Sequence, residues 1–202
     1  MAQRGLKVYI ESSILTDWIF LERVEMPGLR VLSKETRDGY ALIERILKHD
    51  SGMFEFSTST WAISESMQNY LRSHAMFKML FDNLSFRYYE AVRGYSRYKL
   101  ARKRFTQLKT ELMGTLNAAE EKKRLSIVSS TGRLERKIHK YLYMGFDAED
   151  AQHLILAIDL LHAEYLVTKD RDFTDQKETL EKEQITVILP SEMLQHLRTQ
   201  QP

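Results

Sequence analysis

The sequence alternates short apolar runs with longer segments that repeat apolar residues at helical spacing, and this alternation limits the fold more than any other feature. Each apolar run has the length of a buried strand, and the runs lie at residues 6–10, 53–57, 165–168 and 185–189. The helical segments lie at residues 12–22, 34–48, 59–73 and 148–163 and from Pro190 onward. Strands that alternate with helices favour a parallel sheet covered on both faces. The sequence therefore predicts an α/β fold in three layers, α/β/α, around a central parallel sheet.

The middle of the chain departs from this alternation, because a helical pattern continues almost throughout residues 75–144. We expect pauses in that pattern at residues 114–117 and 126–132, and a helix end at Gly145. We find no stretch that marks a domain boundary. The sequence therefore predicts a single domain over residues 1–202, with an extra helical insertion at about residues 75–144.

The composition of the chain indicates a folded protein and excludes several other classes. Of its 202 residues, 43% are hydrophobic and 29% are charged, which is typical of a folded, helix-rich domain. The absence of Cys excludes a disulfide framework and a thiolate zinc site. No apolar run approaches the roughly 20 residues that a membrane span needs, and the first residues lack the apolar stretch of a secretion signal. We therefore expect a cytoplasmic protein with no membrane partner.

The net charge of +2 conceals an uneven distribution of charge along the chain. Residues 87–140 contain 15 Lys or Arg against 5 Glu and no Asp, whereas the rest of the chain contains 15 basic and 23 acidic residues. Within this basic region, residues 86–99 interleave aromatic and cationic side chains. Aromatic rings can stack on unpaired bases while cations contact phosphates, so the region is a candidate surface for binding RNA.

The cations that we expect to contact RNA are Arg93, Arg97, Arg102, Lys103 and Arg104. The same pattern also fits an amphipathic helix whose tyrosines pack inward and whose cations are solvated. The two interpretations differ in one measurable property, because phosphate contacts make the affinity for RNA fall steeply as the salt concentration rises.

Four acidic residues lie at positions that the predicted elements bring toward one edge of the sheet. Glu11 directly follows the first strand, and Asp170 lies two residues after the third. Asp150 lies in the first turn of a helix that Asp147 is expected to cap, and Glu65 lies on the helix after the second strand. Because parallel strands end at the same edge of a sheet, we expect Glu11 and Asp170 to share that edge.

Each of these acids has an ordinary structural explanation when it is considered alone. An acid in the first turn of a helix interacts favourably with the helix dipole, and an acid after a strand commonly caps a turn. Several carboxylates held together, however, repel one another unless a cation lies between them. Oxygen-rich clusters of this kind suit Mg²⁺ or Mn²⁺. The sequence therefore predicts a divalent-cation site if the acids converge.

His153 lies three residues after Asp150, on the same face of the predicted helix. One interpretation is that it orients Asp150 or contacts a substrate. The other is a histidine of the core whose ring nitrogens bond to the backbone. The sequence leaves both interpretations open.

Four segments together resemble the signature blocks of the PIN domain family, in the family's order and spacing. The segments are residues 8–15 (VYIESSIL), 59–65 (STWAISE), 150–157 (DAQHLILA) and 166–173 (LVTKDRDF). The last two are the most specific, with an acid–Ala–x–His helix start and a strand that ends Val-Thr-x-Asp-x-Asp-Phe. The resemblance covers roughly residues 6–72 and 145–192, and residues 75–144 match no part of it. The first block departs from the family, which usually has Asp at the position of Glu11.

The resemblance implies a PIN-like three-layer fold and an acidic cluster that binds Mg²⁺ or Mn²⁺. The implied roles are catalysis for Glu11, Glu65, Asp150 and Asp170, metal ligation for Glu11, Asp150, Asp170 and Asp172, and support of the metal or the scissile phosphate for Ser13 and Thr168. Such a site implies an endoribonuclease that uses a metal-activated water and leaves a 5′ phosphate and a 3′ hydroxyl.

The leading interpretation is an endoribonuclease that resembles toxins of the VapC type, which implies RNA as the substrate and a cognate antitoxin protein as a partner. The resemblance to PIN domains also implies a homodimer, since such proteins commonly dimerise. A second enzymatic interpretation is an RNA-processing nuclease that has no antitoxin. An interpretation of a different class is a catalytically inactive PIN fold that binds RNA or protein. Glu11 in place of the usual Asp is the main argument for that alternative.

Overall fold

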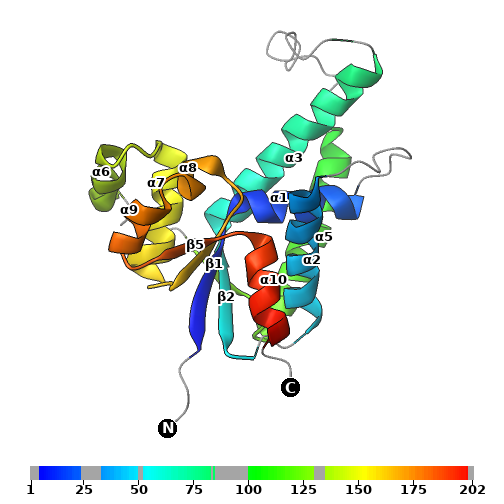
Figure 1. Ribbon diagram of the computed structural model, residues 1–202. Helices are drawn as coiled ribbons and strands as arrows, with labels where there is room; N and C mark the ends of the chain where they lie inside the picture. Colours follow the sequence, from blue (N-terminus) through cyan, green and yellow to red (C-terminus); the bar gives the residue numbers. More distant parts are fainter. Residues whose placement is uncertain are drawn as a thin grey trace.

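A computed structural model describes residues 5–23, 33–49, 52–82, 84, 100–129 and 135–199 (Figure 1). The strands are β1 (Leu6–Ile10), β2 (Phe54–Ser59), β3 (Ser126–Val128), β4 (Tyr165–Val167) and β5 (Thr186–Ile188). The helices are α1 (Ser12–Arg23), α2 (Lys34–Lys48), α3 (Thr60–Phe81), α5 (Arg102–Glu121), α6 (Glu135–Tyr143), α7 (Ala148–Leu154), the π-helix η3 (Ile155–Leu160), α8 (Arg171–Thr174), α9 (Lys177–Lys182) and α10 (Pro190–Thr199).

The five strands form one sheet in the order β3-β2-β1-β4-β5, and every pair of neighbours is parallel. This arrangement confirms the predicted α/β class and the parallel sheet. β1 lies at the centre, with Ile10 opposite Val167 of β4. The residues after these two strands therefore meet at the carboxyl edge of the sheet, where the backbone N–H of Glu11 donates to the carbonyl of Val167 over 3.2 Å.

Apolar side chains alternate along the strands and build one core on each face of the sheet. Val8 and Ile10 pack into a core with side chains of α1, α2, α3, α5 and α10. Tyr9 and Leu166 point the other way, into a core with side chains of α6, α7, η3, α8 and α9. Figure 1 shows these two groups of helices on opposite sides of the sheet. Because both faces are covered, the strands read as nearly continuous apolar runs.

The middle region contributes both a helix to the core and a strand to the sheet. α5 continues through residues 114–117, where a pause was predicted, because Leu108, Leu112 and Leu116 recur every four residues and are all buried. The second predicted pause contains β3, which pairs with β2 at an edge of the sheet. The first prediction was therefore wrong. The second is confirmed for residues 126–129, where the helical pattern stops, although the strand there was not predicted. Packing against the rest of the domain outweighs the weak helix propensity of Gly114.

The helix predicted over residues 148–163 is confirmed from Ala148 to Leu160, but its second part is a π-helix and it ends three residues early. The α-helix ends at Leu154, and η3 continues it as a π-helix whose first three residues are buried in the second core. The predicted end of the preceding helix is confirmed, because Gly145 follows α6 with a φ of +96°. The predicted cap is also confirmed, since Asp147 Oδ1 accepts the backbone N–H of Asp150 over 2.8 Å.

The long helix α3 extends eight residues beyond its predicted end at residue 73 and projects from the body of the molecule in Figure 1. Residues 75–81 were predicted to be helical as part of the middle region, and the structure joins the two predicted segments in one helix that continues to Phe81. Among the described residues, no helix combines the length and the apolar character needed to cross a membrane.

Candidate metal centre

Glu11 is a buried carboxylate whose oxygens are bonded by donors from two segments of the chain. It directly follows β1 and is 3% exposed. Its Oε1 accepts the backbone N–H of Ser13 over 2.9 Å and the hydroxyl of Ser12. Its Oε2 accepts the hydroxyl of Ser13 and, over 2.9 Å, that of Thr168. These bonds replace the water that burial removes, and they fix the direction of the carboxylate.

Thr168 links Glu11 to Asp170, because its hydroxyl oxygen also accepts the backbone N–H of Asp170 over 2.9 Å. Thr168 is fully buried directly after β4. The two residues that were predicted to support the site, Ser13 and Thr168, thus both donate to Glu11. In this structure they hold the Glu11 carboxylate in place, whereas the role expected of them was support of the metal or the scissile phosphate.

His153 on α7 lies between Glu65 and Tyr9 and is bonded by side chains at both ring nitrogens. Its Nε2 lies 2.6 Å from Glu65 Oε2, and its Nδ1 lies 2.9 Å from the Tyr9 hydroxyl, which in turn lies 2.8 Å from Ser59 Oγ. Because a carboxylate only accepts hydrogen bonds, Nε2 carries the shared proton. Nδ1 accepts the proton of Tyr9 when the ring is neutral, and it donates to the Tyr9 oxygen when the ring is ionised.

This arrangement overturns the interpretation of His153 as a core histidine satisfied by the backbone. The residue is 1% exposed, but its partners are side chains from β1 and α3. It also differs from the expectation that His153 orients Asp150, because the hydrogen bond goes to Glu65 instead. The sequence spacing favoured Asp150 since the two residues share a helix, whereas Glu65 approaches from α3 across the end of the sheet.

Charge and burial have opposite effects on the pKa values of His153 and Glu65. Burial alone would lower the pKa of His153, but its hydrogen bond to Glu65 and the charges of Glu11, Glu65 and Asp150 outweigh burial and raise it. Burial would raise the pKa of Glu65, yet the hydrogen bond and the charge of His153 lower it. The pair is therefore stabilised in its ionised form, and Glu65 carries a charge that His153 compensates.

Glu11, Glu65 and His153 form what we call the inner cluster. One ligand atom from each, two carboxylate oxygens and a ring nitrogen, lies within 4.8 Å of the other two. His153 Nε2 is 3.8 Å from Glu11 Oε1. Once a cation displaces the proton of Nε2, this donor set fits a divalent cation that accepts both oxygen and nitrogen, such as Mn²⁺. The three side chains come from segments far apart in the sequence.

Asp150, Asp170 and Asp172, which we call the outer acids, lie where α7 and α8 begin. Burial, together with the charges of Asp147, Asp170 and Asp172, raises the pKa of Asp150 to about 7. Burial also raises the pKa of Asp170, with Glu11, Asp172 and Glu65 adding to the effect. These shifts mean that the carboxylates repel one another across the rim, an excess of negative charge that a cation would relieve.

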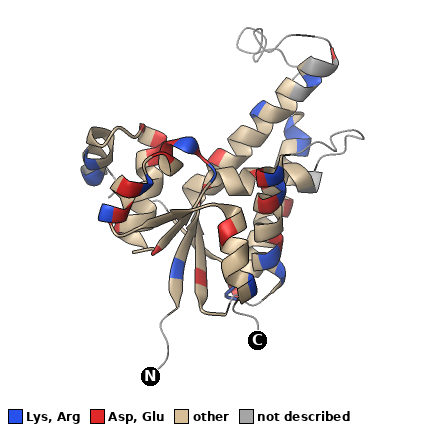
Figure 2. Cartoon of the chain, viewed as in Figure 1, with Lys and Arg blue, Asp and Glu red and all other residues tan. Residues whose placement is uncertain are grey.

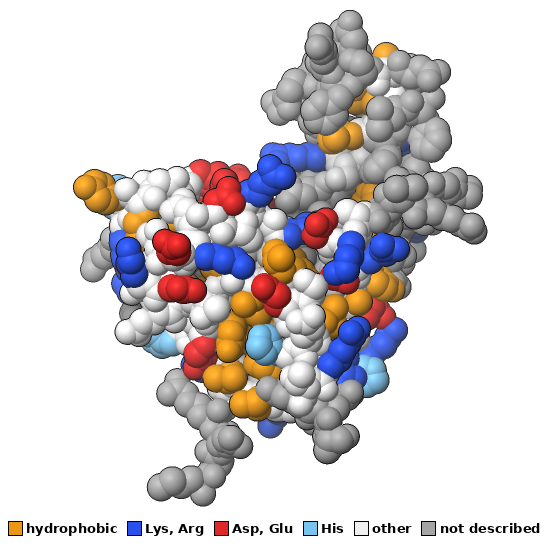
Figure 3. Space-filling model, in the orientation of Figure 1, with side chains coloured by type: hydrophobic (Ala, Val, Ile, Leu, Met, Phe, Trp, Pro, Cys, Tyr) orange, Lys and Arg blue, Asp and Glu red, His pale blue; other side chains and the backbone are white. Residues whose placement is uncertain are grey.

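The acidic residues at the starts of α7 and α8 gather at one end of the sheet in the ribbon view (Figure 2). On the surface, acidic side chains sit together on the upper rim of the face shown in Figure 3, next to Lys and Arg side chains. Asp170 also caps α8, since its Oδ1 accepts the backbone N–H of Asp172 over 3.0 Å. Of the four acids predicted to converge, Glu11 and Glu65 lie together in the inner cluster, whereas Asp150 and Asp170 interact with that cluster through their charges.

The cations predicted to contact RNA are described only in part. Arg102, Lys103 and Arg104 form the exposed first turn of α5. Arg93 and Arg97, together with the rest of the interleaved aromatic segment, lie outside the described residues. The exposed turn is consistent with a contact surface, and equally with solvated charges on a helix whose other face is buried.

Tyr9 and Ser59 belong to the site but were not predicted from the sequence. Tyr9 was considered only as part of a strand, although its hydroxyl is a polar group in a fully buried position. A buried tyrosine hydroxyl needs a partner, and this requirement was the available signal. The partner, His153, lies 144 residues away in the sequence, so the local pattern could not predict which residue it is.

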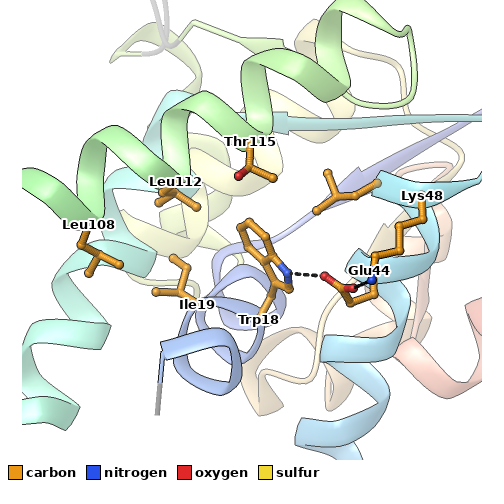
Figure 4. A pocket seen from close by; sticks show the side chains of 8 residues that line it. Trp18, Ile19, Glu44, Lys48, Leu108, Leu112 and Thr115 are labelled. Atoms are coloured by element: carbon orange, nitrogen blue, oxygen red, sulfur yellow. Dashed lines mark hydrogen bonds and ion pairs between the residues drawn. The ribbon is translucent and has the colours of Figure 1, made fainter. Parts of the chain in front are cut away.

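A separate cavity of about 250 Å³ lies between α1, α2 and α5 and shares no residue with the inner cluster or the outer acids (Figure 4). Trp18 Nε1 donates to Glu44 Oε1 over 3.0 Å, and Lys48 pairs with the same carboxylate. The polar groups at its rim thus already bond to one another. The other lining residues are Ile19, Leu47, Leu108, Leu112 and Thr115.

Comparison with known proteins adds no family to this description. A scan against protein-family models finds no match for the chain, and a search of curated proteins finds none either. The resemblance to PIN domains therefore stays a prediction, which rests on the four sequence blocks.

Proposed function

We propose that this protein is a divalent-cation-dependent endoribonuclease of the PIN type. The observation that carries the proposal is the gathering of acids from four separate segments at one edge of the sheet, where burial and the charges of neighbouring carboxylates raise the pKa values of Asp150 and Asp170. Such an excess of negative charge is unfavourable unless a cation or a reaction makes use of it. Together with the four sequence blocks, it favours a site for Mg²⁺ or Mn²⁺.

Two sets of side chains would hold the cation. The inner cluster offers Glu11, Glu65 and His153, and the outer acids add Asp150, Asp170 and Asp172. When bound, such a cation polarises the phosphate and acidifies water, which is the chemistry that phosphodiester hydrolysis requires. A carboxylate-rich set favours Mg²⁺ or Mn²⁺, whereas the nitrogen of His153 favours Mn²⁺ over Mg²⁺.

The residues of the chain have separable roles in this proposal. Ser13 and Thr168 hold the Glu11 carboxylate by hydrogen bonds, so that it does not rotate away from the edge. Tyr9 holds His153, and His153 holds Glu65. In the reaction, water adds to phosphorus and the P–O3′ bond breaks, which leaves a 5′ phosphate and a 3′ hydroxyl.

The substrate in this proposal is RNA, and the exposed turn with Arg102, Lys103 and Arg104 is a candidate contact for its phosphates. Replacing these three residues by Gln should weaken RNA binding and reduce its dependence on salt. A cognate antitoxin and a homodimer belong to the same proposal, through the resemblance to VapC-type toxins.

The test combines metal binding with cleavage. Mn²⁺ should bind the wild-type protein in calorimetry, and a labelled structured RNA should be cleaved only when Mg²⁺ or Mn²⁺ is present. Chelation by EDTA should stop cleavage, and added Mn²⁺ should restore it. Cleavage that continues in EDTA, or in Asp150→Asn and Asp170→Asn, would contradict the proposal.

The alternative of a catalytically inactive module has one observation in its favour. Glu11 already accepts four hydrogen bonds and Glu65 is paired with His153, so part of the cluster is satisfied without a cation. A module of this kind would bind RNA in the presence of EDTA as well as in its absence. Wild-type protein that shows no Mn²⁺ binding but retains salt-dependent RNA binding would favour it.

A further inference from the structure

A buried ion pair lies next to the candidate metal centre but belongs to neither set of cation ligands. Asp17 on α1 is 5% exposed, and its Oδ1 accepts a hydrogen bond from Lys169 Nζ. The Lys169 side chain is 27% exposed. Removing two opposite charges from water is costly, so a buried pair is a poor means of gaining stability compared with apolar side chains of the same volume. Its location in the fold therefore indicates the role of the pair better than its contribution to stability does.

Lys169 occupies the position between two residues of the site. Thr168 donates to Glu11, and its oxygen accepts the backbone N–H of Asp170 over 2.9 Å. The backbone N–H of Lys169 itself points to Ser13 Oγ at 3.4 Å. The ion pair thus adds a side-chain link between α1 and the loop after β4, and both ends of that link are close in sequence to groups that hold Glu11.

The neighbouring helix leaves room for Asp17 at one position. Gly39 lies in the interior of α2, where glycine is unfavourable by comparison with alanine. A Cβ built on Gly39 would lie 2.7 Å from Asp17 Oδ2. Glycine therefore lets α2 approach α1 without displacing the carboxylate. Burial also raises the pKa of Asp17 to about 6 against the lowering effect of Lys169, so the carboxylate depends on the lysine to stay ionised.

We propose that Asp17 is a positioning residue for the candidate metal centre: through Lys169 it fixes the loop that carries Thr168 and Asp170 against Glu11. Asp17, Gly39 and Lys169 fit one another although they lie on three different segments. The expected effect of this link on cation binding rests on the proposed function. The expected effect on the position of the loop does not, because it follows from the ion pair alone.

The first measurement therefore uses metal-free protein. In Asp17→Asn, which keeps the size of the side chain and removes its charge, the backbone amides of Lys169 and Asp170 should exchange with solvent about tenfold faster by residue-resolved NMR, because loss of the pair raises the population of open loop conformations. The amides of Leu166 and Val167 in β4 should keep their protection. Gly39→Ala should act in the same direction, because the added methyl displaces Asp17 from the side of α2.

The second measurement is Mn²⁺ affinity by calorimetry, well below the melting temperature of each variant. Asp17→Asn and Lys169→Met should each weaken Mn²⁺ binding roughly tenfold, as loss of an outer support of a metal site does. The double variant should be no weaker than either single one, because both remove the same link. A purely structural pair would lower the melting temperature and leave the Mn²⁺ affinity unchanged.

Asp38→Asn is the matched control, because it breaks a more exposed ion pair with Lys34 on α2, next to Gly39. It should change neither the amide exchange of the loop nor the Mn²⁺ affinity. Unchanged loop exchange in both Asp17→Asn and Gly39→Ala overturns the proposal. If wild-type protein binds no Mn²⁺, the proposed function fails, and the exchange measurement alone then decides the role of Asp17.

Discussion

The inner cluster and the outer acids lie at the same edge of the sheet, but the protein stabilises their buried charges to different extents. In the inner cluster, Glu11 is surrounded by donors and Glu65 is paired with His153. Among the outer acids, burial and the charges of neighbouring carboxylates raise the pKa values of Asp150 and Asp170. One side of the site is therefore held in place by the protein alone, while the other has charge that the protein leaves uncompensated.

The difference indicates that the two sets of residues contribute separately to the position of a bound cation and to its affinity. Fully bonded carboxylates keep a fixed direction, which is what a ligand needs in order to be preorganised. Carboxylates that repel one another gain the most when a cation arrives, because it removes the repulsion. We therefore expect the inner cluster to set where a cation binds and the outer acids to set how tightly it binds.

The largest expected effect follows from removing the charge of the outer acids. The double variant Asp150→Asn, Asp170→Asn should lower RNA cleavage more than about 100-fold, since the loss of a bound cation costs several kcal/mol of transition-state stabilisation. Cleavage of a labelled RNA in Mn²⁺ measures the effect. Glu149→Gln, an exposed acid on the same helix turn, is the control and should cleave normally. Wild-type cleavage rates in the double variant would contradict the inference that the outer acids set how tightly a cation binds.

The next effect concerns the stability of the inner cluster. Tyr9→Phe removes the hydroxyl between Ser59 and His153, and leaves the buried Nδ1 of His153 without that partner. Unfolding in denaturant should show a loss of about 1–3 kcal/mol. Tyr165→Phe in the adjacent strand removes a hydroxyl that is not part of this chain of hydrogen bonds, and it should cost less. Equal losses in the two variants would show that the chain of bonds contributes nothing specific.

The pH dependence of cation binding tests the outer acids directly. Without a cation, Asp150 has a pKa of about 7, so below that pH a proton occupies a group that the cation needs. Displacing one proton should weaken Mn²⁺ binding by up to about tenfold for each pH unit below the pKa. Calorimetry one pH unit above and one unit below the pKa should reveal the difference, and Asp150→Asn should abolish it. The same slope in the variant would assign the proton to another group.

The smallest effect is on the stability of the metal-free protein. The folded state raises the pKa of Asp150, so it binds a proton more tightly than the unfolded chain does. The resulting stabilisation is present at low pH and is lost as the pH rises from the ordinary carboxyl pKa through about 7. In EDTA, Asp150→Asn should melt at a slightly higher temperature than wild type above that window. A variant that melts lower at every pH would mean that Asp150 stabilises the apoprotein.

Much of the fold followed from local patterns in the sequence. The bounds of β1 and α2 agree with the prediction, because alternation and helical spacing are properties of a few neighbouring residues. The cap at Asp147 was also predicted, since it depends only on the next three residues. β3 was missed, and the π-helical form of η3 was not predicted, because a strand of three residues and a widened helical turn form through contacts with the rest of the sheet and core.

The sequence by itself determined the parallel sheet and the edge at which Glu11 and Asp170 meet, because the direction of the strands fixes where each one ends. Only the tertiary structure decided that His153 bonds to Glu65 and Tyr9, and that Lys169 bonds to Asp17. These pairs join residues 88, 144 and 152 positions apart. Their formation depends on how α1, α3 and α7 pack against the sheet, and packing angles are set by the shapes of many side chains together.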